Sequence, residues 1–266
     1  MTDLQIAVLA LIQGITEFLP ISSSAHLVLV PALTGWPDQG LMIDIAVHVG
    51  SLGAVLLYFR DDVGLTVRGA LEAATGERRT FGARLAVLIG LATIPVVVAG
   101  LALKTVTDDG LRSVALIGAA SLFFGILLHV VDRMAPRRRN LVEMTRADAV
   151  TVGLAQALAL IPGTSRAGIT ITAARALGYE RAEAARFSML LAIPTVLGAG
   201  TLLVIDLIEL NQAGVGRDAV LAAVLAFAAA YGSIVFLMRW LKFAGFLPFV
   251  IYRCTLGAVL LIWALA

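Results

Sequence analysis

Long uninterrupted runs of apolar residues dominate the pattern of hydrophobic and polar positions along this chain. A helix needs roughly 20 apolar residues to cross a bilayer, and six runs meet that requirement: approximately 42–60, 83–104, 111–131, 184–206, 218–239 and 247–265. The runs do not alternate at every second residue, which excludes the strand pattern of an outer-membrane barrel. The pattern therefore predicts an all-α polytopic membrane protein with six transmembrane helices.

Two further apolar regions are each interrupted near the middle. Residues 4–33 are broken by Pro20 and three serines, and residues 147–177 are broken by the sequence Pro-Gly-Thr-Ser-Arg at 162–166. Each half has about 14 residues, or ~21 Å of helix, which is less than the ~30 Å apolar core of a bilayer. We predict that both regions are re-entrant helical hairpins, which enter and leave the membrane on the same side.

The basic residues are distributed unevenly between the loops. If the spans alternate, Lys104, Arg112 and Arg217 lie on one side. The other side holds twelve: Arg60, Arg68, Arg78, Arg79, Arg84, Arg133, Arg137, Arg138, Arg139, Arg146, Arg239 and Lys242. Cytoplasmic loops are enriched in Lys and Arg, so the twelve mark the cytoplasmic side. This alternation requires the second broken region to return to the side that it entered.

The two broken regions resemble one another. Residues 14–17 (Gly-Ile-Thr-Glu) align with 153–156 (Gly-Leu-Ala-Gln), and after an offset residues 20–25 align with 162–167. Each half is then a hairpin followed by three spans, an odd number, so the halves face opposite ways. We predict one integral membrane domain, 1–266, in which repeat 1 (about 1–134) and repeat 2 (about 146–266) form the inverted topology known from transporters. The segment 61–81 is expected to be a surface loop.

Composition agrees with the membrane class. Hydrophobic residues make up 60% of the chain and charged residues 14%, whereas soluble domains have about 45–50% and about 25%. The net charge of +2 follows from basic cytoplasmic loops, and we expect no nucleic-acid partner and no obligate protein partner. Cys254 alone forms no intramolecular disulfide. Residues 1–5 contain no Lys or Arg, so the first helix is not expected to be a cleaved signal peptide.

The first break carries reactive side chains. Gln13 and Glu17 share one helix face, and Ser23 and His26 share a face of the following helix. Ionisable groups inside apolar segments are expensive and therefore indicate function. A structural role, in which Glu17 pairs with a basic residue and His26 with a carbonyl, is the alternative. The motif also contains three hydroxyl side chains, those of Ser22, Ser23 and Ser24.

The second break has the chemistry of an anion site. Gly163 permits a tight turn, Thr164 or Ser165 can cap the new helix, and the helix start attracts anions. Arg166 adds a planar fork suited to phosphate oxygens, and Thr170 adds a hydroxyl. The alternative is a capped helix with an interfacial arginine. Together the breaks favour a phosphate ligand, and a diphosphate with a divalent cation fits better still, because Glu17 alone would repel an anion.

The segments QGITEFLPISSSAHL and PGTSRAGIT resemble the two signature motifs of the bacitracin-resistance family, the undecaprenyl-diphosphate phosphatases. The resemblance implies hydrolysis of undecaprenyl diphosphate to undecaprenyl phosphate and inorganic phosphate, which recycles the lipid carrier of cell-wall synthesis and links the family to bacitracin resistance. It also implies a multi-pass protein of the bacterial inner membrane, with Mg²⁺ or Ca²⁺ as cofactor and a site open to the outer side. Gln13 stands where many members have a second glutamate.

The family's roles then fall on particular residues. The expected catalytic residues are Glu17, Ser23, His26 and Arg166, with Glu17 also holding the metal. The expected substrate-binding residues are Gln13, Ser22, Ser24, Gly163, Thr164, Ser165 and Thr170. Ser23 is the favoured nucleophile, activated by His26 or Glu17, although His26 or water remains open as the nucleophile. A lipid-phosphate transporter or flippase that uses the same site is the alternative function, and a cation-coupled symporter is a third.

Polar residues elsewhere in the spans give weaker signals. His48, with Asp44 one turn earlier, either lines a cavity formed by the two breaks or makes a hydrogen bond within its own helix. Arg253 either extends to the interface or supports the site from behind. Arg175 and Arg186 are expected to contact lipid headgroups.

Overall fold

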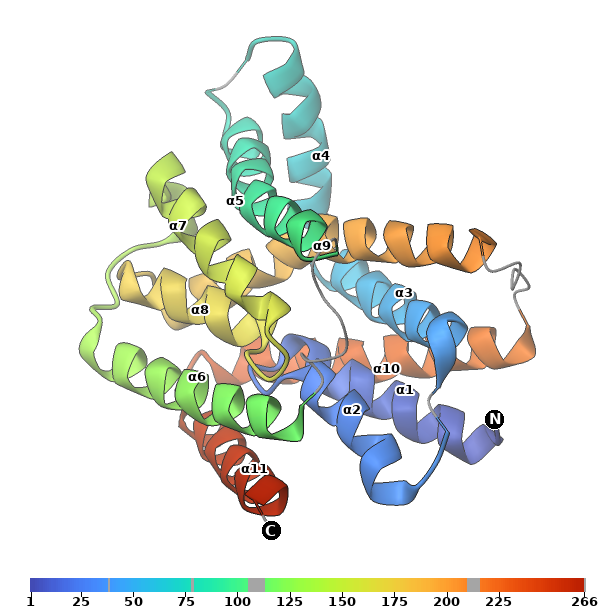
Figure 1. Ribbon diagram of the computed structural model, residues 1–266. Helices are drawn as coiled ribbons and strands as arrows, with labels where there is room; N and C mark the ends of the chain where they lie inside the picture. Colours follow the sequence, from blue (N-terminus) through green and yellow to red (C-terminus); the bar gives the residue numbers. More distant parts are fainter. Residues whose placement is uncertain (38, 78, 105–112, 210–215, 266) are drawn as a thin grey trace.

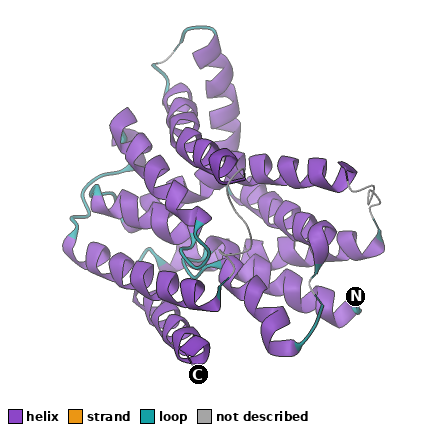
Figure 2. Ribbon diagram, in the orientation of Figure 1, coloured by secondary structure: helices purple, strands orange, loops and turns teal. Residues whose placement is uncertain are grey.

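The chain folds into an all-helical bundle. The computed structural model describes residues 1–37, 39–77, 79–104, 113–209 and 216–265. Across these ranges every regular element is a helix, and the only β-type pairing is an isolated bridge between Arg139 and Tyr179 (Figure 2).

Within the described ranges, six helices are long and apolar enough to cross a membrane. They are α3 (Gly40–Tyr58), α5 (Phe81–Lys104), α6 (Val114–Met134), α9 (Arg181–Glu209), α10 (Arg217–Trp240) and α11 (Leu247–Leu265). A helix bonds all of its backbone polar groups internally, which an apolar solvent demands. The six predicted spans are confirmed with small shifts at their ends, and residues 111 and 112 of the third lie outside the described ranges.

The two broken regions form pairs of short helices. The first pair is α1 (Asp3–Phe18) and α2 (Ser23–Thr34), and the second is α7 (Arg146–Ala157), extended by the 3-10 turn η3 (Leu158–Leu160), and α8 (Arg166–Ala176). At 1.5 Å per residue, the 16 residues of α1 and the 11 of α8 fall short of the ~30 Å apolar core of a bilayer. The predicted positions of both breaks are therefore correct.

The expected surface loop at 61–81 is wrong, because most of it is helix α4 (Arg60–Ala74). This helix lies against α5, and the two stand together at the top of Figure 1. A Cβ atom at Gly69 would lie 2.0 Å from the carbonyl carbon of Gly82. The absence of a side chain at Gly69 therefore allows the two helices to approach closely.

Two corresponding glycines set the contacts between the halves. Helix α10 packs along α1 and α3, while α5 packs along α7 (Figure 1). A Cβ atom at Gly14 of α1 would lie 2.5 Å from the oxygen of Ala226 in α10, and one at Gly153 of α7 would lie 2.5 Å from the oxygen of Ala92 in α5. The first helix of each broken region therefore packs on the second long helix of the other half.

One end of the bundle is held together by buried arginines. Arg175 is fully buried, and its Nε donates to Asp132 Oδ1 at 3.0 Å. Arg181 also contacts both oxygens of Asp132, with Nη2–Oδ2 at 2.6 Å. The expectation that Arg175 meets lipid headgroups is wrong, because it satisfies a buried carboxylate instead. Arg186 of α9 pairs with Asp62 of α4.

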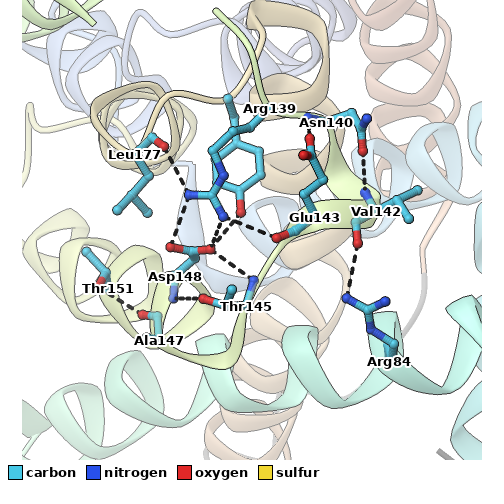
Figure 3. Close-up of polar contacts among 11 residues, drawn as sticks. Arg84, Arg139, Asn140, Val142, Glu143, Thr145, Ala147, Asp148, Thr151 and Leu177 are labelled. Carbon is cyan, nitrogen blue, oxygen red and sulfur yellow. Dashed lines mark hydrogen bonds and ion pairs between the residues drawn. The ribbon is translucent and has the colours of Figure 1, made fainter. Parts of the chain in front are cut away.

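A second ionic cluster lies beside it, at the start of α7 (Figure 3). Asp148 accepts hydrogen bonds from Arg139 Nη2 at 2.6 Å, Tyr179 Oη at 2.7 Å and the Thr145 backbone at 2.9 Å. Burial raises the pKa of Asp148, but the hydrogen bonds from Arg139, Thr145 and Tyr179 outweigh burial and bring the pKa to about 2. The cluster ties the 3-10 turn η2 (Leu141–Glu143) and its flanking residues to α7 and α8.

The Asp148 cluster predicts how stability depends on pH. The pKa of Asp148 falls from an ordinary 3.8 to about 2 on folding, so its contribution is present above the ordinary value and is lost as pH falls through 2. We expect Asp148→Asn to lower the stability by about 2 kcal/mol at pH 7. The difference from wild type, followed by thermal unfolding in detergent, should close between about pH 5 and pH 2. The exposed Asp61→Asn is the control, and a difference that persists at pH 2 would contradict the prediction.

Candidate active site

Each helix break contains a serine whose backbone has a positive φ angle. Ser22 directly precedes α2 with φ 74°, and Ser165 directly precedes α8 with φ 67°. These are the non-glycine residues with positive φ in the described chain, and such conformations cost about 1–3 kcal/mol each. The sequence alignment paired Ser165 with Ser23, whereas the backbone pairs it with Ser22. The local register of the two breaks therefore differs from the prediction by one residue.

Arg253 of α11 contacts both breaks. Its side chain is fully buried, and Nη2 donates to the carbonyls of Gly163 at 3.0 Å and Thr164 at 2.7 Å. Nη1 lies 3.5 Å from the carbonyl of Pro20. The break in a helix leaves carbonyls without partners, and this guanidinium satisfies them. Of the two roles open for Arg253, the structure excludes interfacial snorkelling.

Glu17 joins the two broken regions directly. Its Oε1 accepts from Arg166 Nη2 at 2.9 Å across 149 residues of sequence. Its Oε2 accepts from Gln13 Nε2 at 2.9 Å and from Ser23 Oγ at 2.6 Å. The two breaks therefore meet at this carboxylate. The cation that Glu17 lacks in its own region is supplied by the other region.

His26 faces away from this centre. Its Nδ1 donates to the carbonyl of Ser22 at 2.7 Å, so in the neutral ring Nε2 accepts from Tyr252 Oη at 2.5 Å. The two rings also stack, with centroids 5.6 Å apart. Both ring nitrogens are therefore engaged, and Ser23 bonds to Glu17. The spacing of Ser23 and His26 does not bring them together.

The remaining predicted hydroxyls divide between the site and the packing. Ser165 Oγ accepts from the backbone of Gly168 and caps α8. Thr170 Oγ1 lies 2.7 Å from Ser188 Oγ in a buried contact with α9. Thr164 is fully buried, and its hydroxyl has no hydrogen-bond partner among the described residues. Ser165 and Thr170 thus hold α8, which begins at Arg166, in place through capping and packing contacts.

A cavity of about 280 Å³ opens on Ser23. Ser23, Ser24, Gln39, Asp44 and His48 form its polar wall, with Leu27, Val28, Pro162 and Leu203 as the apolar part. His48 Nδ1 donates to the backbone oxygen of Asp44 at 2.7 Å, which leaves Nε2 as the acceptor. Asp44 and His48, which lie one turn apart on the same helix, therefore form part of the cavity wall. The imidazole that meets the cavity is His48.

An apolar groove of about 270 Å³ adjoins this cavity at His48. It runs between α3 and α9, and its lining includes Val49, Leu52, Leu197 and Gly200. Val49 and Leu197 are both exposed. The polar cavity thus continues into a surface that faces lipid.

Comparison with known proteins gives one consistent result. The family model described as bacitracin resistance protein BacA matches residues 6–259. The chain is 52% identical to the undecaprenyl-diphosphatase of Roseobacter denitrificans, with 99% of each chain covered. It is 51% identical to that of Ruegeria pomeroyi, with 98% of each covered. It is also 50% identical to undecaprenyl-diphosphatase 1 of Rhodospirillum rubrum, over 97% of this chain and 94% of the relative.

This chain belongs to the BacA family. The predicted resemblance is confirmed, and the two motifs that carried it are the two helix breaks. In this BacA-family protein the motifs share a contact surface because Glu17, Ser23 and Arg166 form a continuous chain of hydrogen bonds. A hydroxyl held by a carboxylate, next to a guanidinium, is an arrangement suited to nucleophilic attack on an anionic phosphorus centre.

The donor set around Glu17 bears on the predicted metal. Across the described residues, no group of three or more His, Cys, Asp or Glu side chains is placed to hold an ion. Gln13 is fully buried, however, and its Oε1 has no hydrogen-bond partner among the described residues. One carboxylate and one amide oxygen suit a Mg²⁺ ion whose other ligands are water and substrate phosphates. They do not suit a cage made by the protein alone.

Tyr252 and Arg253 are the parts of the site that the sequence motifs missed. Neither lies in a motif, and each acts through a contact with a residue more than 80 positions away. The available signal was an aromatic hydroxyl and an arginine side by side in an otherwise apolar span. Such side chains inside a membrane segment indicate a partner within the protein.

Removing the arginine that joins the breaks tests its role. We expect Arg253→Met to lower the unfolding free energy by roughly 3 kcal/mol or more, because it leaves buried carbonyls unpaired. The unfolding free energy of Arg253→Lys should lie between those of wild type and Arg253→Met, because an ammonium group reaches fewer carbonyls. Thermal unfolding in detergent measures both. The exposed Arg239→Met makes the same chemical change as a control, and equal losses in the two methionine variants would contradict the prediction.

Proposed function

We propose that this protein hydrolyses the phosphoanhydride bond of undecaprenyl diphosphate, which yields undecaprenyl phosphate and inorganic phosphate. The observation that carries the proposal is the hydrogen-bonded chain Ser23–Glu17–Arg166, assembled from two distant motifs. Family membership and relatives named undecaprenyl-diphosphatase at about half identity over nearly the full length support the substrate.

Arg166 and the start of α8 hold the terminal phosphate. The guanidinium now pairs with Glu17, and a diphosphate offers it two oxygens in place of one carboxylate oxygen. The start of α8 carries partial positive charge and stabilises negative charge. Ser165 and Thr170 keep this helix start in position through their capping and packing contacts.

Ser23 is the proposed nucleophile and Glu17 its base. Ser23 Oγ attacks the terminal phosphorus, its proton passes to Glu17 Oε2, and the bond to the bridging oxygen breaks. Undecaprenyl phosphate leaves with the electron pair of that bond, and a phosphoserine remains. Water then attacks this phosphorus, the bond to Ser23 Oγ breaks with its electron pair on that oxygen, and Glu17 returns the proton to it. Inorganic phosphate and the free hydroxyl of Ser23 result.

The two histidines have different proposed roles. His48 faces the cavity with Nε2 free of protein partners among the described residues, so it is placed to accept a proton from the attacking water. His26 holds Ser22 at the break and stacks on Tyr252. It therefore orients Ser23 through the backbone.

A divalent cation is part of the proposal. Glu17 and the unpartnered Oε1 of Gln13 would hold Mg²⁺ or Ca²⁺ beside the diphosphate. When bound, the ion neutralises phosphate oxygens.

We infer that both broken regions are re-entrant hairpins in an inverted repeat within a single domain. The pairing of Asp3 with Arg217 sets the start of α1 at the start of α10, and the bridge between Arg139 and Tyr179 joins the ends of α6 and α8. Gly14 and Gly153, which the alignment pairs, make equivalent close contacts with opposite halves.

The cavity faces the outer side of the inner membrane in this proposal. Its lining comes from the start of α3 and from Leu203 in the later part of α9. The opposite end of the bundle contains the ends of α6 and α10 with their basic residues. The distribution of basic residues makes that end the cytoplasmic side.

A lipid-phosphate carrier is the weaker alternative. A carrier needs a guanidinium and helix starts to bind phosphate, but it gains nothing from a serine bonded to a carboxylate. The Ser23–Glu17 hydrogen bond of 2.6 Å therefore favours hydrolysis.

Substitutions at Ser23 test the mechanism. Release of inorganic phosphate by purified protein in detergent, with C15 and C55 diphosphates, should fall by roughly 10³-fold or more in Ser23→Ala. It should fall by about 10²–10⁴-fold in Glu17→Gln, which removes the base, and Arg166→Ala should lose activity on both chain lengths. Ser113→Ala, which removes an exposed hydroxyl outside the cavity and the groove, is the matched control and should keep nearly normal turnover.

Trapping the phosphorylated protein identifies the nucleophile. Phosphoserine at position 23 is expected, whereas phosphohistidine, or normal turnover by Ser23→Ala, would eliminate Ser23 from that role. Absence of phosphate release by wild type, together with transbilayer movement of the lipid, would instead favour the carrier.

The apolar groove is the proposed site of the polyprenyl chain. A leucine at Gly200 would fill the groove without a clash, because no atom lies within 4 Å of its Cβ position. We expect Gly200→Leu to raise the KM for C15 and C55 diphosphates about tenfold and to leave a C5 diphosphate unaffected. Gly198→Leu, on the same helix but outside the groove, is the control. Equal KM values for the two variants would place the chain elsewhere.

A further inference from the structure

A second polar cavity lies at the arginine-rich end of the bundle. Its volume is about 340 Å³, and it is lined by His129, Arg133, Arg137 and Arg181 together with Asp132 and the turn before α11. None of these residues lines the cavity at Ser23. The two cavities are on opposite ends of the long helices, so the proposed hydrolysis does not use this one.

The positive charge of this cavity is not balanced by the protein. Asp132 is the carboxylate in its wall, and both of its oxygens already accept from Arg175 and Arg181. Arg137 makes one long contact, 3.4 Å from Nη2 to the backbone oxygen of Asp132. Arg133 is exposed and has no ion pair within the described chain. Three arginines therefore line a cavity whose one carboxylate is already bonded to Arg175 and Arg181, and Arg133 and Arg137 keep free donors.

The start of α11 adds a further attraction for anions. The preceding residue, Phe246, lines the cavity and has no side-chain acceptor to cap the helix. Pro248 has no N–H group, so the first-turn donors are those of Leu247 and Phe249. A helix start carries partial positive charge and binds phosphate groups, and here it adjoins the arginines.

Exposed apolar side chains occur in the cavity wall and next in sequence to it. Met134 follows the lining residue Arg133 and is 79% exposed, and Leu247 in the wall is 46% exposed. A ligand with a phosphate group and an apolar chain fits both surfaces. A free phosphate ion fits the arginines alone.

We propose that this cavity binds a phosphate group, carried by an anionic membrane lipid whose chains lie against Met134 and Leu247. Inorganic phosphate offers the same chemistry, and the experiment separates the two sources. Each basic residue near an anionic headgroup contributes about 1 kcal/mol. Loss of Arg133 and Arg137 should therefore weaken binding roughly 10- to 30-fold.

The test is native mass spectrometry of the full chain in detergent, titrated with phosphatidylglycerol or with zwitterionic phosphatidylcholine. Wild type should retain phosphatidylglycerol preferentially, and Arg133→Ala/Arg137→Ala should lose that preference. Arg79→Ala/Arg138→Ala removes the same charge from exposed positions outside the cavity and should bind like wild type. In a second arm, inorganic phosphate is titrated into lipid-free protein carrying Arg166→Ala, so that the site at Ser23 does not contribute.

The outcomes are distinguishable. Loss specific to the cavity variant in the lipid arm supports a lipid headgroup, and loss specific to it in the phosphate arm supports the same site with free phosphate as ligand. Equal binding by the cavity and control variants in both arms overturns the proposal. Melting temperatures verify that each variant is folded, and Arg133→Gln/Arg137→Gln repeats the test with longer polar side chains. Phosphate release from a C15 diphosphate, which depends on Ser23, should be unchanged in the Arg133/Arg137 and Arg79/Arg138 variants that keep Arg166.

Discussion

A charged group buried in an apolar bundle needs a partner of opposite charge or a set of hydrogen bonds, and this requirement organises the protein. Glu17 and Arg166 satisfy it for one another, although they lie in different halves of the chain. Arg253 satisfies it by binding carbonyls that two broken helices leave free. An unpaired charge at either position would cost several kcal/mol. The same contacts that stabilise the bundle therefore set the geometry of the site.

The breaks are necessary for this arrangement. A continuous helix would bond its own carbonyls and bury its N–H groups, and it would present neither to a ligand. Ending α1 after Phe18 and starting α8 at Arg166 exposes these groups at one place. The left-handed backbone at Ser22 and Ser165 is the cost of so sharp a turn. Strained residues thus lie where the chemistry is placed, and the surrounding helices hold them there.

The opposite end of the bundle follows the same physical rule with a different result. Asp132 pairs with Arg175 and Arg181 in a buried cluster, and Asp148 pairs with Arg139 and Tyr179. From the sequence Arg175 was expected to contact lipid headgroups, because basic residues near span ends often do. The acidic partners are 43 and 9 positions away. Only the folded chain shows which arginines are already paired and which, such as Arg133, are not.

The sequence by itself determined the six spans, the two breaks and the family, because apolar run length and the position of Pro, Ser and Gly are local properties. It also indicated that Glu17 and Arg166 carry function, since such residues are costly in apolar segments. Tertiary structure decided which groups meet. It turned His26 toward Tyr252 and left His48 at the cavity, moved Thr170 into the packing, and brought α4 onto α5 at Gly69. Partner choice depends on distances between segments far apart in the chain, and no local pattern encodes those distances.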